Sequence, residues 1–311
     1  MITRRESLIR LFKVSSLFTL SSLGIWPFET KSLVQLTSAK KGFIVEGVGK
    51  RKGYSIKELT RKVFEAAGGA AGFISRGDVV VIKPNISWAS RPELAATTNP
   101  VVLEAVVELC LEAGAKKVRI VDHTIHDARR CFALTGTGAV AKRTGAELVF
   151  PRSSLMKKMK IRGHRIDVWP VFVPVVEADR LINIPVAKVH GLSTLTLGMK
   201  NWFGAIGGRR NVLHQDIHQT IVDLAQFFTP TFTLIDATRI MIRGGPSGGR
   251  KSDVAIKNTL ILSDDQVASD ALATKFFGYT PEEIGFIRLG QKWGLGTHDL
   301  NRLDQRRVVI S

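Results

Sequence analysis

The segment DVVVIKPNISWASRPELAATTNPVVLEAVVELCLEAGAKKVRIVDH (residues 78–123) contains the pattern that decides the fold. It opens with the β-branched run of residues 79–82, which is typical of a strand buried on both faces of a parallel sheet. Asn99 and Pro100 then mark a helix start, because asparagine caps the free N–H groups and proline fits the first helical turn. Residues 118–121 form a second apolar run. Strand, helix and strand in this order predict a βαβ unit with a right-handed crossover.

The same alternation continues on both sides of this unit. Hydrophobic periodicity predicts further strands at residues 42–48, 147–150, 180–184, 232–235 and 259–262, and further helices at residues 56–67, 136–144, 216–228, 267–277 and 281–293. The basic residues 151–170 lack a strong period and indicate a hairpin or excursion around residues 162–164. We therefore predict an α/β fold, with a mainly parallel sheet flanked by helices, in a single large domain over residues 40–311. Residues 151–178 are the candidate for a small inserted lobe.

Residues 1–39 have the features of an export signal. The sequence TRRESL (residues 3–8) resembles the twin-arginine signature, although Ser7 stands where a bulky apolar residue is commoner. Residues 14–28 are uncharged but too short and serine-rich for a membrane span, and residues 37–39 are small enough for a cleavage site. We expect a periplasmic or extracytoplasmic protein that uses the export machinery and contacts the membrane only through this segment. The alternative is a basic amphipathic N-terminus in the cytoplasm.

The composition limits the classes of partner and cofactor. The net charge is +18, and residues 151–200 hold nine Lys/Arg against three Asp/Glu. Such a surface attracts polyanions or acidic small molecules, but the chain lacks the long basic run with interleaved aromatic residues that indicates a nucleic-acid surface. The two cysteines, Cys110 and Cys131, are too few to ligate an iron–sulfur cluster or an all-cysteine zinc site. A disulfide between them is one alternative, and burial of Cys110 in a helix is the other. We expect an anionic ligand, no nucleic acid and no iron–sulfur cluster.

Polar residues follow several predicted strands at the point where each strand ends. They are Lys83, Asn85, Asp122, Asn183, Asp236 and Asp264. Because ligands of open parallel sheets bind beyond the carboxyl ends of the strands, we expect these residues on one rim. We assign Lys83, Asn85, Asp122 and Asp236 to ligand binding. A role as caps or turn formers explains Asp122 and Asp236 equally well.

The stretch RLINIPVAKVHGLSTLTLGMKNWFGAIGGRRNVLHQDIH (residues 180–218) is expected to supply the rest of the site. Lys188 and His190 are two residues apart, so they face the same way on an extended segment. Lysine and asparagine suit a carboxylate or phosphate through charge-assisted hydrogen bonds, and glycine-rich backbone can hold an anion through its N–H groups. We assign Lys188, Asn201 and Gly204 to ligand binding.

Acid/base chemistry is the expected role of His190, His214 and Lys200. Crowding lowers the pKa of a lysine, which makes its amine a base or nucleophile. His214 and His218 share a face if they are helical, and with Asp216 they form a weak candidate for a metal site. The alternative is that Asp216 caps the helix while the histidines pack or reach solvent. A P-loop and a G-x-G-x-x-G motif after a strand are both missing from the sequence, so an ordinary nucleotide-binding fold is not expected.

These motifs together resemble the family known as domain of unknown function 362. The matching pieces are Val81–Asn85, Glu112–Ala115, Ile184-Pro185 with Lys188-x-His190, Leu197–Asn201 with Gly204, His214, Ile235–Ala237, Gly245-Pro246 and Val267–Ala271. Many members resemble iron–sulfur proteins because ferredoxin-type cysteine runs are appended. This chain lacks those runs, so the resemblance does not imply that cofactor, and the family has no settled activity to transfer. A more distant similarity to the nickel-cofactor lactate racemase family concerns the fold alone.

Three functions fit the sequence. The first is an exported enzyme that binds an acidic small molecule or anionic organic cofactor at the Lys/Asn/His cluster and performs acid/base or redox chemistry. The second is a binding protein that uses the same cluster without chemistry. The third is a polyanion-binding surface protein, in which case binding would fall steeply with salt.

Overall fold

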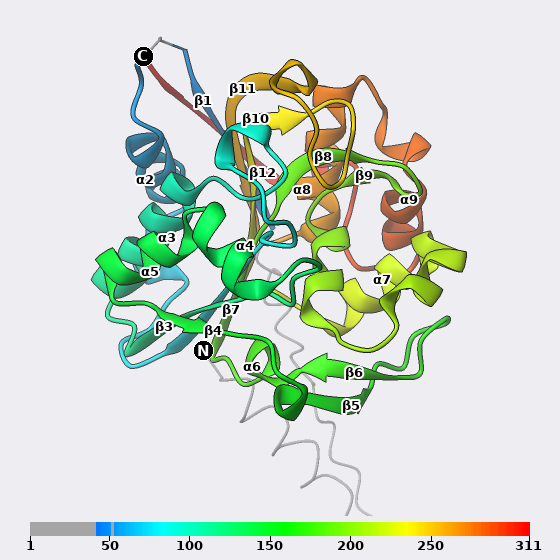
Figure 1. Cartoon of the computed structure of the whole chain (residues 1–311). Coiled ribbons are helices and arrows are strands. Elements are labelled where there is room, and N and C mark those ends of the chain that lie inside the picture. The colour runs from blue at the N-terminus through cyan, green and yellow to red at the C-terminus, as the bar shows by residue number, and fades with distance from the viewer. Residues whose placement is uncertain (1–41, 51–52) are drawn as a thin grey trace, which may run out of the picture. The chain divides into compact units, whose positions relative to one another are not determined.

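A mixed sheet of ten strands organises the part of the chain that the computed structural model describes, residues 42–50 and 53–311 (Figure 1). The strands lie in the order β12 (Asp304–Ile310), β1 (Phe43–Gly49), β11 (Val254–Ser263), β10 (Phe232–Met241), β7 (Arg180–Ile184), β2 (Val79–Pro84), β3 (Lys117–Val121) and β4 (Glu147–Val149). The remaining two strands of this sheet are β8 (Val186–His190), which pairs with β10, and β9 (Thr194–Thr196), which pairs with β8.

Most neighbouring strands are parallel, which confirms the predicted fold class. The strand β2 pairs in parallel with β3 and β7, and β10 pairs in parallel with β7 and β8. The exceptions in this sheet are the β8–β9 pair and β11, which is antiparallel to both β1 and β10. The carboxyl end of β11 therefore lies at the opposite edge of the sheet, so the expected place of Asp264 on the site rim is wrong. Its Oδ1 accepts a hydrogen bond from Phe43 N at 2.9 Å, at the start of β1.

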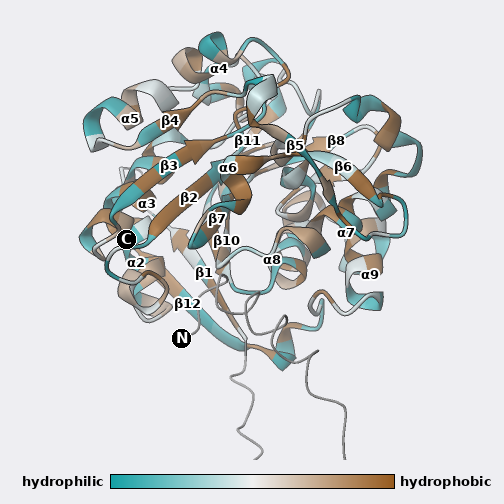
Figure 2. Ribbon diagram, turned by 90° about the horizontal axis from the view of Figure 1, so that it is seen from below, coloured by the Kyte–Doolittle hydropathy of each residue, from teal (hydrophilic) through white to brown (hydrophobic). Residues whose placement is uncertain are grey.

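Helices cover both faces of the sheet (Figure 1). The helices of the described residues are α2 (Ile56–Ala66), α3 (Pro100–Glu112), α4 (Ala128–Leu134), α5 (Thr137–Thr144), α6 (Val173–Val176), α7 (Ile217–Phe227), α8 (Gln266–Ala273) and α9 (Gly285–Lys292). Apolar residues of α2, α3, α4 and α5 pack in one core cluster with Val80 and Ile82 of β2. Val81 belongs to the other cluster, with residues of α7, α8 and α9. Burial on both faces explains the continuous β-branched run, and Figure 2 shows the hydrophobic strands between the helices.

The βαβ unit forms as its sequence predicts. Asn99 precedes α3 in extended conformation, and its side chain accepts a hydrogen bond from Val101 N at 3.1 Å. Pro100 occupies the first helical position, where the missing N–H costs nothing. This helix connects β2 to the parallel strand β3 and places the ends of both strands at one edge.

Several elements escaped the sequence analysis. The strand β12 carries polar residues at the sheet edge, so it lacks an apolar run. The hairpin of β8 and β9 begins directly after Pro185, beyond the strand predicted at residues 180–184. The predicted helix at residues 267–277 is split into α8 and a 3-10 turn at Thr274–Phe277.

The hairpin expected within residues 151–170 is present as a separate antiparallel pair, β5 (Met156–Lys160) with β6 (Val168–Phe172).

Residues 42–311 form one compact unit. Cys110 and Cys131 are both buried and unpaired, so the disulfide alternative is wrong. The export signal expected at residues 1–39 lies outside the described residues. Among the described helices, none combines the length and the apolar character that crossing a membrane requires.

Candidate functional site

A pocket of about 230 Å³ lies at the edge of the sheet where β2, β3 and β8 end. It is lined by Asn85, Ser87, Trp88, Ile125, Lys188, His190, Thr196, Lys200, Asn201, Phe203, Gly204, Arg210, His214 and Pro246. The structure thus brings seven of the residues assigned from the sequence to one cavity. They are Asn85, Lys188, His190, Lys200, Asn201, Gly204 and His214. Their roles in binding or chemistry stay predictions.

The floor beneath this pocket is a buried ion pair. Lys83 Nζ lies 2.7 Å from Asp122 Oδ1, and both side chains are fully buried. Lys83 Nζ also donates to Pro84 O at 2.8 Å and to Asn201 Oδ1 at 3.1 Å. The other Asp122 oxygen accepts a hydrogen bond from Ile86 N at 2.6 Å. Burial lowers the pKa of Lys83, and the adjacent Asp122 opposes that shift. Both residues are thus used inside the protein and do not line the pocket.

The floor leaves no room for a side chain at Gly204. A Cβ atom at this position would lie 1.9 Å from Asp122 Oδ1 and 2.7 Å from Lys83 Nζ. The Gly204 carbonyl also accepts a hydrogen bond from His123 N at 2.7 Å. The glycine that we assigned to anion binding therefore allows the backbone to approach the ion pair closely.

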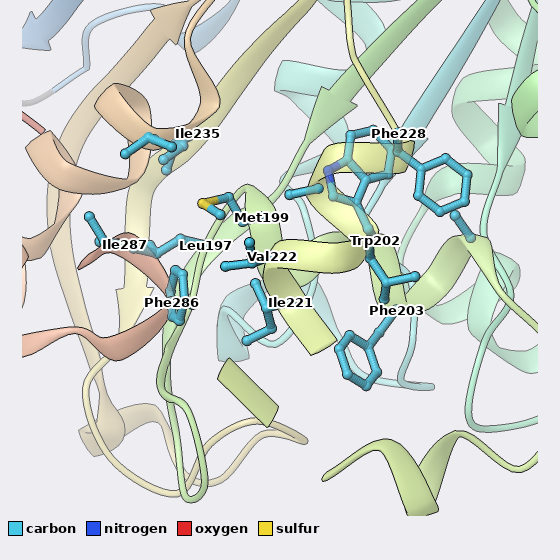
Figure 3. Close-up of a cluster of buried hydrophobic side chains, with 14 of the residues drawn as sticks. Leu197, Met199, Trp202, Phe203, Ile221, Val222, Phe228, Ile235, Phe286 and Ile287 are labelled. Atoms are coloured by element: carbon cyan, nitrogen blue, oxygen red, sulfur yellow. The ribbon is translucent and has the colours of Figure 1, made fainter. Parts of the chain in front are cut away.

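The segment that carries Lys200 and Asn201 is a buried 3-10 turn, Met199–Ala205. Asp270 of α8 holds its start by accepting hydrogen bonds from Gly198 N at 2.6 Å and Met199 N at 2.9 Å. Burial raises the pKa of Asp270 to about 8, against the two backbone hydrogen bonds. Trp202 stacks on Phe228 with ring centroids 5.1 Å apart, in the apolar cluster of Figure 3. These contacts fix the turn, so Lys200 projects from rigid backbone.

Two lysines, Lys188 and Lys200, form the basic wall of the pocket, and they differ in their hydrogen-bond partners. Lys188 Nζ donates to Ala96 O at 2.5 Å and to Asn85 Oδ1 at 3.4 Å. Lys200 Nζ lies 3.5 Å from the centroid of the Phe203 ring and makes no hydrogen bond or ion pair within residues 42–50 and 53–311. Burial and, to a smaller extent, neighbouring cations together lower the pKa of each lysine to about 7. Lys200 is therefore the amine of the pocket that remains available.

His190 is held as a hydrogen-bond donor. Its Nδ1 accepts hydrogen bonds from Leu192 N at 3.1 Å and Ser193 N at 3.2 Å. We infer from these contacts that Nδ1 is unprotonated and that Nε2 carries the proton. Burial, followed by the charge of Lys200, lowers the His190 pKa to about 3. The ring is therefore neutral near pH 7, and its free group is an N–H donor.

His214 is held in the opposite tautomer. Its Nδ1 lies 3.1 Å from the carbonyl oxygen of Arg210, which only accepts, so Nδ1 donates and Nε2 keeps a lone pair. Burial and then Lys200 lower the pKa of His214 as well. The two imidazole rings lie 6.1 Å apart and are tilted by only 13°. One pocket therefore holds a neutral hydrogen-bond donor, His190, and a neutral proton acceptor, His214.

Arg210 is a site residue that the sequence analysis missed. Its guanidinium donates to the carbonyl oxygens of His123 at 2.8 Å, Phe203 at 3.1 Å and Thr124 at 3.0 Å. The run Gly207-Gly208-Arg209-Arg210 was interpreted as a source of backbone N–H groups for an anion. Only the fold shows that Arg210 is the arginine that turns inward. The apolar walls formed by Trp88 and Ile125 were missed for the same reason, since they come from loops.

Besides Lys83 and Asp122, three residues assigned from the sequence do not line the pocket. Asp236 accepts hydrogen bonds from Asn99 N at 2.7 Å and Thr238 Oγ1 at 2.6 Å, so it holds the start of α3. His218 packs against Phe286 with ring centroids 6.2 Å apart. Asp216 precedes α7 without a side-chain capping bond, which corrects the expected cap.

The helical face expected to join His214 and His218 does not exist. The helix α7 begins only at Ile217, and His214 lies in the preceding 3-10 segment, Arg210–Asp216. His214 therefore faces the pocket, while His218 packs against Phe286. In the described part of the chain no group of three His, Cys, Asp or Glu residues is arranged to hold a metal ion.

Comparisons with known proteins show which family the chain belongs to. The chain is 26% identical to a thylakoid-associated protein of Synechocystis sp. over 249 residues, which cover 78% of this chain and 76% of that protein. Among solved structures it resembles the lactate racemase apoprotein of Thermoanaerobacterium thermosaccharolyticum, with a TM-score of 0.49 and 15% identity. That match covers 78% of this chain and 58% of the racemase chain. The family described as "Domain of unknown function (DUF362)" matches residues 80–275, more than half of the chain, so the protein belongs to the DUF362 family.

Proposed function

We propose that the pocket binds a small organic anion, with a carboxylate or phosphate group, and that His214 exchanges a proton with that ligand while His190 donates a hydrogen bond to it. The observation that carries the proposal is the charge of the lining. Lys188, Lys200 and Arg210 line the pocket, whereas no Asp or Glu is among its described lining residues. Such a cavity attracts anions, and bound anions favour the charged lysines.

The walls select an organic ligand rather than a bare ion. Trp88, Ile125, Phe203 and Pro246 add apolar surface to the lining beside its polar groups. Pockets of this composition bury the apolar body of a ligand and orient it through a few polar contacts. Because the cations are enclosed, this arrangement favours a small molecule over nucleic acid.

The histidine pair supports proton transfer at the bound ligand. The His214 Nε2 lone pair accepts a proton, and the His190 Nε2–H donates a hydrogen bond to an oxygen that gains charge. Lys200, with its pKa near 7, stabilises negative charge when protonated and serves as a second base when neutral. A ligand with an acidic C–H or O–H beside its anionic group fits these roles.

Calorimetry and isotope exchange test the proposal together. Titration with phenyl phosphate and benzoate measures binding, and native mass spectrometry of protein from its natural compartment measures a retained ligand. For a retained ligand, NMR in D₂O measures deuterium entry. We expect His214→Gln to keep binding but lose exchange. Binding without exchange in the wild-type protein would favour the non-catalytic alternative, and no binding of any anion would refute the proposal.

We further propose that the protein is exported through its N-terminal segment. The TRRESL sequence of residues 3–8 supports this, and the thylakoid association of a relative supports a location at a membrane. Replacement of Arg4 and Arg5 by lysine tests the proposal by cell fractionation. The variant should accumulate in the cytoplasm, and an unchanged distribution would refute twin-arginine export.

A further inference from the structure

A second cavity, of about 300 Å³, shares no lining residue with the first. It is lined by Gly53, Tyr54, Ile56, Asn99, Thr238, Arg239, Ile256 and Asn258. Its residues come from the starts of α2 and α3 and from the paired strands β10 and β11. The function proposed for the first pocket does not use any of these residues.

The main polar group of this cavity is a buried arginine with an unused donor. Arg239 is 9% exposed. Its Nε donates to Pro92 O at 2.5 Å and its Nη1 to Thr238 Oγ1 at 3.5 Å. Its Nη2 is buried without a hydrogen-bond partner among the described residues. Buried donors without a partner are rare in folded proteins, so we expect a bound ligand to supply an acceptor for Arg239 Nη2.

The nearby carboxylates do not supply that acceptor. Asp236 and Glu93 act on Arg239 only as neighbouring charges that raise its pKa, against the larger lowering by burial. The oxygens of Asp236 already accept hydrogen bonds from Asn99 N and from Thr238. No ion pair of Arg239 occurs within the described residues.

A bulge in the sheet places Arg239 beside Tyr54. The register of β10 and β11 shifts between Ala237 and Arg239, where two residues of β11 lie opposite one of β10. One of those residues, Asn258, has a positive φ of 50°. Its Oδ1 accepts a hydrogen bond from the Tyr54 hydroxyl at 3.2 Å. Bulges of this kind re-aim side chains and are common beside binding sites.

Two helix N-termini add positive potential to the same cavity. The helix α2 begins at Ile56 and α3 follows Asn99, and both of these residues line the cavity. The partial positive charge at each helix start favours an anion. The cavity is therefore lined by the buried arginine and by residues at two helix starts.

We propose that this second cavity is a binding site for a phosphate group. A tetrahedral oxyanion would accept hydrogen bonds from the Arg239 guanidinium and face the starts of α2 and α3. A phosphate monoester and inorganic phosphate share this chemistry.

Titration with inorganic phosphate, followed by calorimetry, tests the proposal. We expect Arg239→Gln to weaken the phosphate binding of this site at least tenfold. In the control Lys200→Met, which alters only the first pocket, that binding should persist. Unchanged phosphate binding in a folded Arg239→Gln protein would overturn the proposal.

Crystals soaked in selenate keep the test decisive if Arg239→Gln does not fold. Selenate has the shape of phosphate and scatters anomalously. An anomalous peak between Arg239 and Tyr54 in the wild-type protein is the expected result. Its absence in soaked crystals at millimolar selenate would overturn the proposal, whichever variant folds. Titration with glycerol phosphate then separates a phosphate monoester from the free ion as the preferred ligand.

Discussion

The floor and the wall of the main pocket hold lysines in contrasting surroundings. In the floor, Lys83 Nζ lies 2.7 Å from Asp122 and donates hydrogen bonds to Pro84 O and Asn201. In the wall, Lys200 Nζ faces the Phe203 ring and has no hydrogen bond or ion pair among the described residues. Both amines are buried, so burial alone does not separate structural from functional lysines. The difference lies in whether the protein supplies the partner, and Lys200 is left for a ligand to complete.

Breaking the floor pair should give the largest effect on stability. Asp122→Ala leaves the Lys83 ammonium buried without its counter-ion, which typically costs about 3–5 kcal/mol of unfolding free energy. Urea denaturation at pH 7 measures the loss. The matched control, Lys200→Met, removes a buried lysine without a protein partner and should not lower the stability, because burial of its ammonium disfavours the folded state. Equal losses in the two variants would erase the distinction between floor and wall.

Gly204→Ala should give a smaller loss by crowding the same pair. The new methyl group overlaps Asp122 Oδ1, so the turn or the carboxylate must shift. Overpacking of this kind costs about 1–3 kcal/mol. Thermal denaturation is the measurement, and Gly191→Ala, where a Cβ meets no atom within 4 Å, is the matched control. An unchanged midpoint for Gly204→Ala would show that the floor is not tightly packed.

The pH dependence of stability and of anion affinity should differ in sign, because the protonated lysines of the wall favour an anion but disfavour the folded state. The folded pKa of Lys188 and Lys200 is about 7, against 10.5 for an ordinary lysine. Between these values the unfolded state holds more protons, so stability should rise with pH above 8, by up to about 1.4 kcal/mol per unit and lysine. Anion binding needs the protonated amines, so affinity should fall over the same range.

A stability that rises with pH while the affinity falls would therefore show that the buried lysines of the wall carry the charge that binds the anion. Urea denaturation and calorimetry with phenyl phosphate at pH 8, 9 and 10 measure the two slopes. Lys200→Met should reduce both. Parallel slopes, or slopes that this substitution leaves unchanged, would contradict a role of Lys200 in anion binding.

Much of the fold and part of the site follow from local sequence. The βαβ unit is predicted because the run at residues 79–82 and the Asn99 cap both act locally. Lys188 and His190 were expected on one side of an extended segment, and both line the pocket. Asp264 shows the limit, because its place depends on the direction of β11, which pairing across the sheet decides.

Other residues were misassigned or missed for related reasons. Asp236 holds the start of α3, a contact between residues far apart in the chain. Arg210 faces the pocket because its guanidinium donates hydrogen bonds to carbonyl groups of two other segments, His123-Thr124 and Phe203. The sequence shows which side chains are able to bind an anion. Tertiary contacts decide which of them already have a partner.

The most direct test of this account is calorimetric titration of Lys200→Met with phenyl phosphate at pH 7. Loss of one charge-assisted hydrogen bond, worth about 1.5–3 kcal/mol, predicts a fall in affinity of about 10- to 100-fold. The unfolding free energy of the same variant should not fall below that of the wild-type protein. Unchanged affinity in a stable Lys200→Met protein would contradict the claim that Lys200 binds the anionic ligand.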